Sequence, residues 1–232
     1  MLALREVVKR FSVGDAEPVQ AVAGVSLSVA PGELVALYGP SGSGKSTLLL
    51  LAAAVMRPDS GEVVLGERQI SSFSPSEAAH YRMHQVGFVR QSLDLIPGAT
   101  ALDNAALKLL GKPATVREAH RKVAPLLSRL GLDERLRHRS DELSMGERQR
   151  VMIARALSTE PELVLADEPT GSLDTDRGRE VLEILSELCR ERRIAVLLVT
   201  HDPQAASFAD RVHTLRDGKL EDAAPTPDNR IE

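Results

Sequence analysis

Cysteine is nearly absent from this 232-residue chain: Cys189 stands alone, so no internal disulfide bond can form. The absence of disulfides suits a reducing compartment. In the segment VLEILSELC, Cys189 follows Leu182 by seven residues and lies on the apolar side of a helical pattern. We therefore expect a buried structural thiol rather than a reactive one.

The chain also lacks an excess of positive charge. Its 29 Lys and Arg residues against 33 Asp and Glu residues give a net charge of −4 and an isoelectric point near 5.9. Such a chain has no overall basic field that would attract nucleic acid or anionic lipid. We therefore expect no nucleic-acid partner.

Long apolar runs are missing as well. The opening MLALREVVKRF is interrupted by charge too early for a signal peptide, and TLLLLAAAVM is too short to span a bilayer. We therefore expect a cytoplasmic protein that meets a membrane only through a partner.

What is present is an ordinary globular composition, 43% apolar and 27% charged. The length suits one domain with a full core or one domain with an inserted lobe. The first part of the chain predicts the following elements: strands at 3–11, 19–30 and 31–39, a helix from Lys45 to about Met56, and strands at 62–66 and 86–91.

From about residue 92 to 143 the pattern is helical and rich in loops. Thr100 in TALD and Thr115 in TVRE both have the spacing of a capping box, and Gly131 ends the second helix. This stretch is typical of a helical lobe inserted into an α/β core.

The core then resumes with a helix from Met145, a strand at 162–167, a helix at 179–191 and a strand at 194–200. The apolar runs LVLA and IAVLLV are unbroken, as expected for central parallel strands that are covered on both faces. The alternation of strands and helices predicts a doubly wound α/β architecture.

The segment GPSGSGKST fits the pattern G-x-x-x-x-G-K-[ST] between a predicted strand and a predicted helix. Backbone N–H groups of such a loop curl around phosphate oxygens, and the helix start adds the positive end of its dipole. Lys45 can reach the β- and γ-phosphates, and the Ser46 hydroxyl can ligate Mg²⁺. The alternative, a glycine-rich turn before a helix, is disfavoured because the motif is complete and its context is right. The loop predicts a nucleotide site formed by Gly39, Pro40, Ser41, Gly42, Ser43, Gly44, Lys45, Ser46 and Thr47.

The segment LVLADE supplies the second half of such a site. A buried strand delivers Asp167 at its C-terminal end, where ligands of open α/β sheets bind. Asp167 would hold Mg²⁺ through water, and Glu168 would polarise the attacking water as general base. Alone, the pair reads as an ordinary strand end with two solvated acids. The phosphate loop in the same chain favours the metal site.

The segment DELSMGERQRV begins a further helix. Ser144 and Glu147 have S-x-x-E spacing, which predicts a capping box. The same helix start can also receive a γ-phosphate, through the Ser144 hydroxyl and the Gly146 N–H group. Because the phosphate loop is already served by its own helix, this second anion site is best explained as belonging to another subunit's ATP.

The stretches LSMGERQRVMIARAL, LVLADEPTGSLD and LLVTHD resemble the nucleotide-binding subunits of ABC transporters. The phosphate loop, Gln91 in FVRQ, the signature at 143–147, the acidic pair, SLD at 172–174 and His201 follow the family's order. The resemblance extends from Leu2 to Leu220. ADEPTGSLD and VGFVRQSLDLIPGATALDN most resemble the branch that serves lipoprotein release, macrolide export and cell division.

The resemblance implies a single ABC ATPase domain over residues 1–232. A P-loop NTPase core of the RecA type would occupy about 1–91 and 144–232, with an N-terminal antiparallel β region and a helical subdomain inserted at about 92–143. The family further implies ATP and Mg²⁺ as cofactors and a head-to-tail dimer with a second copy. It also implies an integral membrane permease, through which the protein would lie at the inner face of the cell membrane.

The resemblance also assigns roles to single residues. Gln91 would sense Mg²⁺ and the attacking water and join the core to the helical subdomain, and His201 would contact the γ-phosphate. Without the family context, each is simply a polar residue at a strand end. Asp174 would lie at the dimer seam, although SLDTD alone also reads as a helix N-cap. Phe11 corresponds to the position whose ring stacks on adenine, with a core phenylalanine as the alternative.

Two positions depart from the family pattern. Phe11 replaces the usual tyrosine, which removes a hydroxyl and keeps the stacking face. Met145 replaces the first glycine of the signature, while the serine and second glycine that would contact phosphate remain. Methionine is a good helix former whose side chain can point away from the phosphate, but its bulk can also obstruct close approach.

These patterns predict an ATP-hydrolysing subunit of an ABC transport system of the export or mechanotransmission type, with Glu168, His201 and Lys45 as catalytic residues. ATP-driven closure of the dimer would drive a permease docked on the helical subdomain. A soluble ABC-type ATPase of translation or DNA repair usually carries two cassettes or a long coiled-coil insertion, and this chain has neither. A P-loop kinase would leave the signature helix and ADEPTGSLD unexplained.

Overall fold

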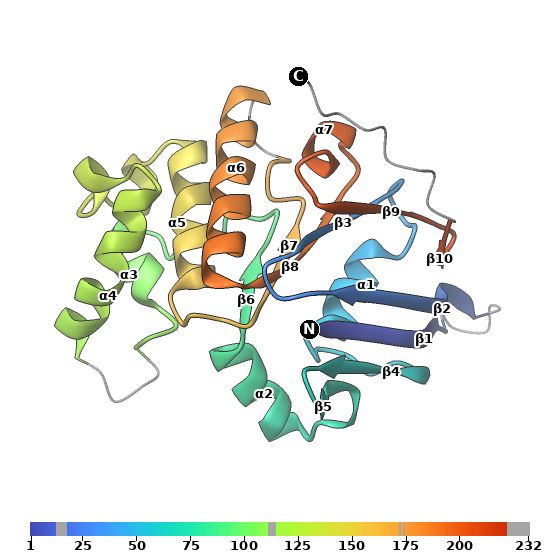
Figure 1. Cartoon of the computed structure of the whole chain (residues 1–232). Coiled ribbons are helices and arrows are strands. Elements are labelled where there is room, and N and C mark those ends of the chain that lie inside the picture. The colour runs from blue at the N-terminus through green and yellow to red at the C-terminus, as the bar shows by residue number, and fades with distance from the viewer. Residues whose placement is uncertain (13–17, 111–114, 172, 174, 222–232) are drawn as a thin grey trace.

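The structure is a computed structural model and describes residues 1–12, 18–110, 115–171, 173 and 175–221. Its N-terminal part forms an antiparallel sheet in the order β2-β1-β4-β5 (Figure 1). The two long strands pair from Leu2 opposite Val29 to Phe11 opposite Val19. The strands of this sheet are β1 (Leu2–Phe11), β2 (Val19–Val29), β4 (Ser60–Leu65) and β5 (Arg68–Gln69).

The second sheet has the order β10-β9-β3-β8-β7-β6, and its neighbours are parallel except for the β10–β9 pair. The carboxyl ends of the parallel strands meet at one edge, where ligands of such sheets bind. The strands are β3 (Leu34–Tyr38), β6 (Val86–Val89), β7 (Leu163–Asp167), β8 (Ala195–Thr200), β9 (Arg211–Arg216) and β10 (Lys219–Leu220). The predicted α/β class is confirmed.

Alternating side chains of the central strands divide the core in two. In β7, Leu163 and Leu165 pack with helix α1 (Lys45–Ala52) and the antiparallel sheet. Val164 and Ala166 face the opposite cluster, with α5 (Met145–Leu157) and α6 (Thr175–Arg192). Both faces of the strand are therefore covered, as its unbroken apolar run predicts.

Helices α3 (Ala101–Ala106) and α4 (Val116–Arg129) form a helical lobe next to α5 (Figure 1). Thr100 and Thr115 each close a capping box, and Gly131 follows the end of α4 with a φ of 69°, so these three expectations are confirmed. Buried side chains of both helices join the cluster of α5 and α6. The lobe is thus packed directly on the helix that begins at the signature.

Several elements differ from the sequence expectations. Helix α1 ends at Ala52 rather than near Met56, because Ala54 turns the chain with a φ of 50°. The strand predicted at 86–91 ends at Val89, where its pairing with β7 stops. Sequence reasoning also missed β5, β9, β10, α2 (Pro75–His84), α7 (Pro203–Ala206) and the short 3-10 turns Ile70–Ser72, Asp133–Arg135 and Ser140–Glu142.

Helix α2 carried a signal that was overlooked. Ser74 and Glu77 form a capping box, and Pro75 occupies the first helical turn. Helix α7 also carried a local signal, because Asp202 caps it and Pro203 is its first residue. Strand β9, in contrast, is a strand because it pairs with β3. Tertiary pairing, rather than local preference, decided its state.

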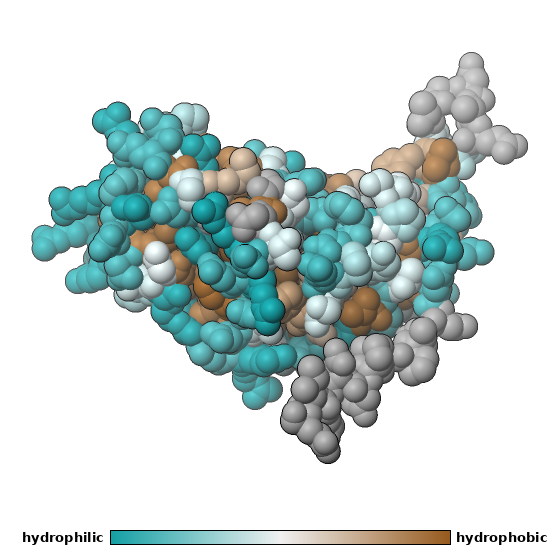
Figure 2. All heavy atoms as spheres, turned by 90° about the horizontal axis from the view of Figure 1, so that it is seen from above, coloured by the Kyte–Doolittle hydropathy of each residue, from teal (hydrophilic) through white to brown (hydrophobic). Residues whose placement is uncertain are grey.

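Among the described residues, none of the helices combines the length and the apolar character needed to cross a bilayer. On the face seen in Figure 2, hydrophilic side chains predominate and hydrophobic ones appear in small patches between them. Cys189 is 1% exposed, so the predicted buried thiol is confirmed.

Candidate nucleotide site

The phosphate loop lies between the carboxyl end of β3 and the start of α1, as its motif predicts. Gly44 immediately precedes the helix with a φ of 103°, a region that favours glycine. A Cβ atom at this position would also collide with the carbonyl oxygen of Ala21 on β2. The antiparallel sheet therefore closes one side of the phosphate loop. Only glycine fits at position 44, between the loop and β2.

Lys45, the first residue of α1, is 7% exposed. Its ammonium group donates to the carbonyl oxygens of Gly39 at 2.7 Å and Pro40 at 2.8 Å, inside the curl of the loop. Burial lowers the pKa of Lys45, while the nearby carboxylates of Glu168 and Asp167 act to raise it. The loop thus holds a partly desolvated positive group that an incoming phosphate can recruit.

Asp167 ends β7 next to the start of α1, with its Oδ1 atom 3.4 Å from the Ser46 hydroxyl. Burial and the neighbouring Glu168 carboxylate raise the pKa of Asp167. A cation between these oxygens would relieve both effects, and hard oxygen ligands are the kind that Mg²⁺ prefers. The donor set therefore fits Mg²⁺.

Glu168 follows Asp167 and has a φ of 47°. Its carboxylate accepts three hydrogen bonds, from the Thr200 hydroxyl at 3.0 Å, the His201 N–H at 2.9 Å and the His201 ring Nδ1 at 2.6 Å. The Glu168 side chain is 13% exposed, whereas that of His201 is 60% exposed. The end of β8 thus orients the carboxylate, and the imidazole covers its solvent side.

These groups surround one cavity of about 360 Å³ at the carboxyl edge of the parallel sheet. The parallel order of the sheet explains this meeting, because β3, β6, β7 and β8 all end at this edge. The lining residues are Ala21, Ser41, Gly42, Gly44, Lys45, Ser46, Thr47, Gln91, Asp167, Glu168 and His201.

Some predicted residues lie elsewhere. Phe11 is 38% exposed at the end of β1, with the Lys9 ammonium 5.8 Å from its ring centre, so the alternative of a core phenylalanine is wrong. Gly39, Pro40 and Ser43 belong to the loop but do not line the cavity. Asp174 lies outside the described residues.

The signature is also outside the cavity, at the start of α5. The Ser144 hydroxyl accepts from the Glu147 N–H at 3.3 Å, and the Ser144 N–H donates to the Glu147 carboxylate at 2.7 Å. The predicted capping box is confirmed. The Ser144 hydroxyl also hydrogen-bonds to the Glu147 carboxylate. Ser144 is exposed, and Met145 has 48% of its surface exposed. Gly146, the other predicted phosphate contact, is buried in the single subunit.

Sequence reasoning missed Thr200 and Ala21 as parts of this site. Thr200 is completely buried and holds the carboxylate of Glu168, while its oxygen also accepts the Asp202 N–H at 3.0 Å. Its position directly before His201 was the available signal. Ala21 offered none, because its backbone oxygen approaches the loop from a distant strand.

Comparison with known proteins agrees with this geometry. A model of the ABC transporter family matches residues 22–171. The lipoprotein-releasing system ATP-binding protein LolD 2 of Caulobacter vibrioides is 45% identical, over 95% of this chain and 96% of the relative. The chain belongs to the ABC transporter family.

Two further matches extend the comparison. The macrolide export ATP-binding/permease protein MacB of Pasteurella multocida is 40% identical over 95% of this chain and 34% of its own length. The dimeric, post-hydrolysis ATP-binding cassette MJ0796 bound to ADP and Pi superposes with a TM-score of 0.87 and 35% identity, over 96% of this chain and 97% of that one. This ABC cassette is an ATP-binding and ATP-hydrolysing subunit, and these relatives belong to the lipoprotein-release and macrolide-export branch.

Proposed function

We propose that this cassette works as a head-to-tail dimer that drives a separate membrane permease, with two ATP molecules held between the subunits. One observation carries the proposal: Ser144 caps α5, is exposed, and does not line the cavity of its own phosphate loop. A capped helix start with an exposed serine hydroxyl offers a phosphate a hydrogen-bond donor and the positive end of the helix dipole. In the dimer, the ATP bound to the second copy would bring its γ-phosphate to the start of α5.

Within one subunit, the phosphate loop and Lys45 bind the phosphates of ATP. Ser46, Asp167 and Gln91 are the residues that would hold Mg²⁺, which neutralises charge on the β- and γ-phosphates when bound. Lys45 gives up its bonds to Gly39 and Pro40 for phosphate oxygens. Phe11, which presents its ring to solvent, stacks on adenine.

Glu168 is the general base in this proposal. The Thr200 hydroxyl and the backbone and ring of His201 aim its carboxylate into the cavity, where Gln91 also lies. Gln91 and Glu168 orient a water molecule, and Glu168 takes its proton. His201, which is more exposed than Glu168, then turns toward the γ-phosphate.

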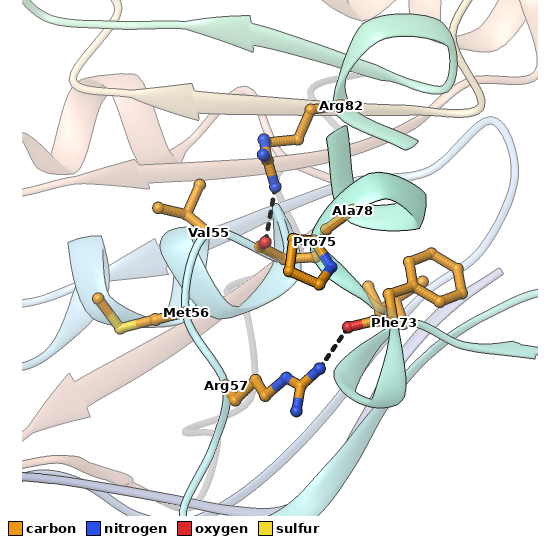
Figure 3. A pocket seen from close by; sticks show the side chains of 9 residues that line it. Val55, Met56, Arg57, Phe73, Pro75, Ala78 and Arg82 are labelled. Atoms are coloured by element: carbon orange, nitrogen blue, oxygen red, sulfur yellow. Dashed lines mark hydrogen bonds between the residues drawn. The ribbon is translucent and has the colours of Figure 1, made fainter. Parts of the chain in front are cut away.

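The same chain presents an apolar surface suited to a membrane partner. A groove of about 540 Å³ runs between the end of α1 and α2 (Figure 3). Figure 3 shows Val55 and Met56 on one side and Phe73 and Pro75 on the other. Both arginines that line the groove donate hydrogen bonds to backbone oxygens. Arg57 donates to the carbonyl oxygen of Phe73, and Arg82 donates to that of Ala54.

The helical lobe adjoins this groove. Lys108 donates to the carbonyl oxygen of Arg82 at 3.1 Å, which places the end of α3 against α2. Leu107 is 38% exposed, Leu110 39% and Met83 40%. We define Val55, Met56, Met83, Leu107 and Leu110 as the docking surface and propose that the permease covers it. The cassette would then be cytoplasmic and peripheral on the inner face of the membrane.

The names of two relatives suggest the direction of transport. Lipoprotein release and macrolide export are the stated systems of the two relatives described above. We therefore propose export or mechanotransmission rather than import.

Mixing two inactive variants tests the dimer. Lys45→Ala disables a phosphate loop, and Ser144→Arg fills the phosphate site of a signature. Each variant alone should be inactive. In a mixed dimer, one site combines the intact loop of the Ser144→Arg subunit with the intact signature of the Lys45→Ala subunit, so ATP hydrolysis should return. No recovery in mixtures that still dimerise would overturn the proposal.

A further inference from the structure

The tight turn between β9 and β10 lies against the phosphate loop, beside β2 (Figure 1). Its two residues, Asp217 and Gly218, have positive φ angles of 48° and 75°. The Gly218 N–H donates to the carbonyl oxygen of Ser43 at 3.1 Å, and the Gly218 carbonyl oxygen accepts from the Ala23 N–H at 2.8 Å. A single residue of the turn therefore bonds to the phosphate loop and to β2 at once.

The three backbones meet at this turn without room for a further side chain. A Cβ atom on Gly218 would lie 2.9 Å from the carbonyl oxygen of Ala21, 3.1 Å from its carbonyl carbon and 3.2 Å from Val22 Cα. These atoms belong to the backbone of β2, so the strand and the turn would have to separate. A Cβ atom on Gly44 of the phosphate loop would lie 3.7 Å from Gly218 Cα. The turn thus fills the gap between the loop and β2 with backbone alone.

Strand β2 carries the side of the site that faces adenine. Ala21 lines the nucleotide cavity, and β2 pairs with β1 as far as Phe11, which lies opposite Val19. Phe11 is the residue proposed to stack on adenine, whereas the phosphate loop binds the other end of ATP. Because ATP joins its two ends covalently, both can bind well only when these two parts of the site are held at the matching distance.

We propose that Gly218 is a positioning residue for ATP, which sets the distance between the phosphate loop and the ring of Phe11. Gly218 does not line the cavity itself, so it acts through the two segments to which it bonds. The inference rests on the proposed stacking of adenine on Phe11 and involves no second subunit. A side chain at position 218 should therefore weaken the contribution of adenine to the affinity and spare that of the phosphates.

Gly218→Ala tests the proposal, because alanine keeps the N–H group that bonds to Ser43 and adds a Cβ atom toward β2. The monomeric variant is titrated with a non-hydrolysable ATP analogue and with inorganic tripolyphosphate, both in the presence of Mg²⁺. The ATP analogue should bind roughly tenfold more weakly, the upper range for the loss of a stacked aromatic contact, and tripolyphosphate should bind unchanged.

The matched control is Gly66→Ala, in the turn between β4 and β5. Gly66 has a φ of 62°, and no described atom beyond its chain neighbours lies within 4 Å of an added Cβ. This variant therefore carries a similar backbone strain without a contact to β2, and both affinities should stay unchanged. Gly218→Asn serves as a second variant in case the alanine variant is unstable, since asparagine tolerates a positive φ better and also carries a Cβ atom. It should show the same selective loss.

A double-mutant cycle with Phe11→Ala supplies a readout that a purely structural role would not move. Phe11→Ala alone should weaken binding of the ATP analogue and leave that of tripolyphosphate unchanged. Phe11→Ala combined with Gly218→Ala should be no worse than the more severe single variant, because both changes remove the same contact with adenine.

Unchanged affinity of both Gly218 variants for the ATP analogue would overturn the inference. An equal loss of affinity for tripolyphosphate would also overturn it, because the effect would then lie in the phosphate loop itself. The same holds for additive losses in the double variant, since Gly218 would then act independently of Phe11. Full affinity of Phe11→Ala for the ATP analogue would instead count against the proposed stacking of adenine. The two failures are thus distinguishable.

Discussion

The ring Nδ1 atom of His201 lies 2.6 Å from the carboxylate of Glu168, across the ends of two neighbouring strands. One hydrogen bond therefore joins Glu168, the proposed general base, to His201, the proposed γ-phosphate ligand. Thr200 completes the arrangement from the buried side of β8. The carboxylate is thereby oriented before any nucleotide arrives, which reduces the reorganisation needed for proton transfer.

The first prediction concerns Glu168. Glu168→Gln keeps the shape and the bond from Thr200 but cannot accept a proton. ATP binding should persist while turnover falls about 10²–10⁴-fold, the usual range for a general base. ATP should also accumulate in a stable dimer, seen by sedimentation. Turnover at the unmodified rate in the presence of the permease would show that another group is the base.

A second prediction concerns Asp167, whose pKa is raised by burial and by the charge of Glu168. As pH rises, the unfolded chain loses the proton of the Asp167 carboxyl first, near pH 3.9. Above that pH, ionisation of Asp167 therefore lowers the free energy of unfolding. This loss of stability grows with pH and reaches its full value once pH has passed the raised pKa of Asp167 in the folded state. Asp167→Asn should therefore raise the melting temperature of the nucleotide-free protein at neutral pH.

The pH and metal dependence check the cause. The advantage of Asp167→Asn should shrink as pH falls through the raised folded pKa and should vanish only below about 3.9, where Asp167 is protonated in both states. Its ATPase activity should be lost at all Mg²⁺ concentrations that support the unmodified protein. A melting temperature that is lower than that of the unmodified protein at neutral pH would contradict the assigned electrostatic cost.

A third prediction concerns Met145, whose side chain is 48% exposed at the start of α5. Side chains of a first turn project away from the axis along which N–H groups meet a phosphate. Met145→Gly should therefore cost under about 1 kcal/mol of stability and change turnover only a few-fold. A large gain in activity would instead reveal that methionine obstructs the signature and that this cassette is a weakened ATPase.

Ser144→Arg is the companion variant. A long side chain at this position should abolish ATP-driven dimerisation and leave ATP binding to the phosphate loop nearly intact, because Ser144 does not line that cavity. Nucleotide affinity is measured at concentrations where the protein is monomeric. Loss of affinity there would place the signature in its own subunit's site.

A fourth prediction concerns the docking surface. A double variant, Met83→Glu and Leu107→Glu, should prevent co-purification with the permease, since carboxylates would be desolvated in the interface. ATPase activity of the isolated cassette should remain. Val116→Glu is the matched control, because Val116 is a 54% exposed valine on α4 outside the docking surface. Equal permease binding by both proteins would place the interface elsewhere.

A fifth prediction concerns Cys189. Burial raises the pKa of its thiol to about 12, and Sγ lies 2.8 Å from the Ile194 carbonyl oxygen. Because the thiolate is the reactive form, alkylating reagents at pH 8 should modify the native protein far more slowly than the unfolded one. Mass spectrometry follows the modification. Rapid labelling of the folded protein would indicate that this region opens.

The sequence by itself determined the parts whose signals are local. The phosphate loop was recognisable because its glycines, Lys45 and Ser46 are contiguous between a strand and a helix. The capping boxes at Thr100, Thr115 and Ser144 were recognisable because donor and acceptor lie three residues apart. The apolar runs of β7 and β8 predicted strands with two covered faces, and both are found in the sheet.

Only the tertiary structure decided which distant residues meet. The parallel sheet brings Gln91, Asp167 and His201 from three strand ends to one cavity. Strand pairing turned β9 into a strand, and a backbone oxygen of β2 makes Gly44 obligatory. The contacts of Gly218 with Ser43 and Ala23 were equally invisible, since they join segments that lie far apart along the chain. Such contacts depend on how whole elements pack, which no local pattern of residues records.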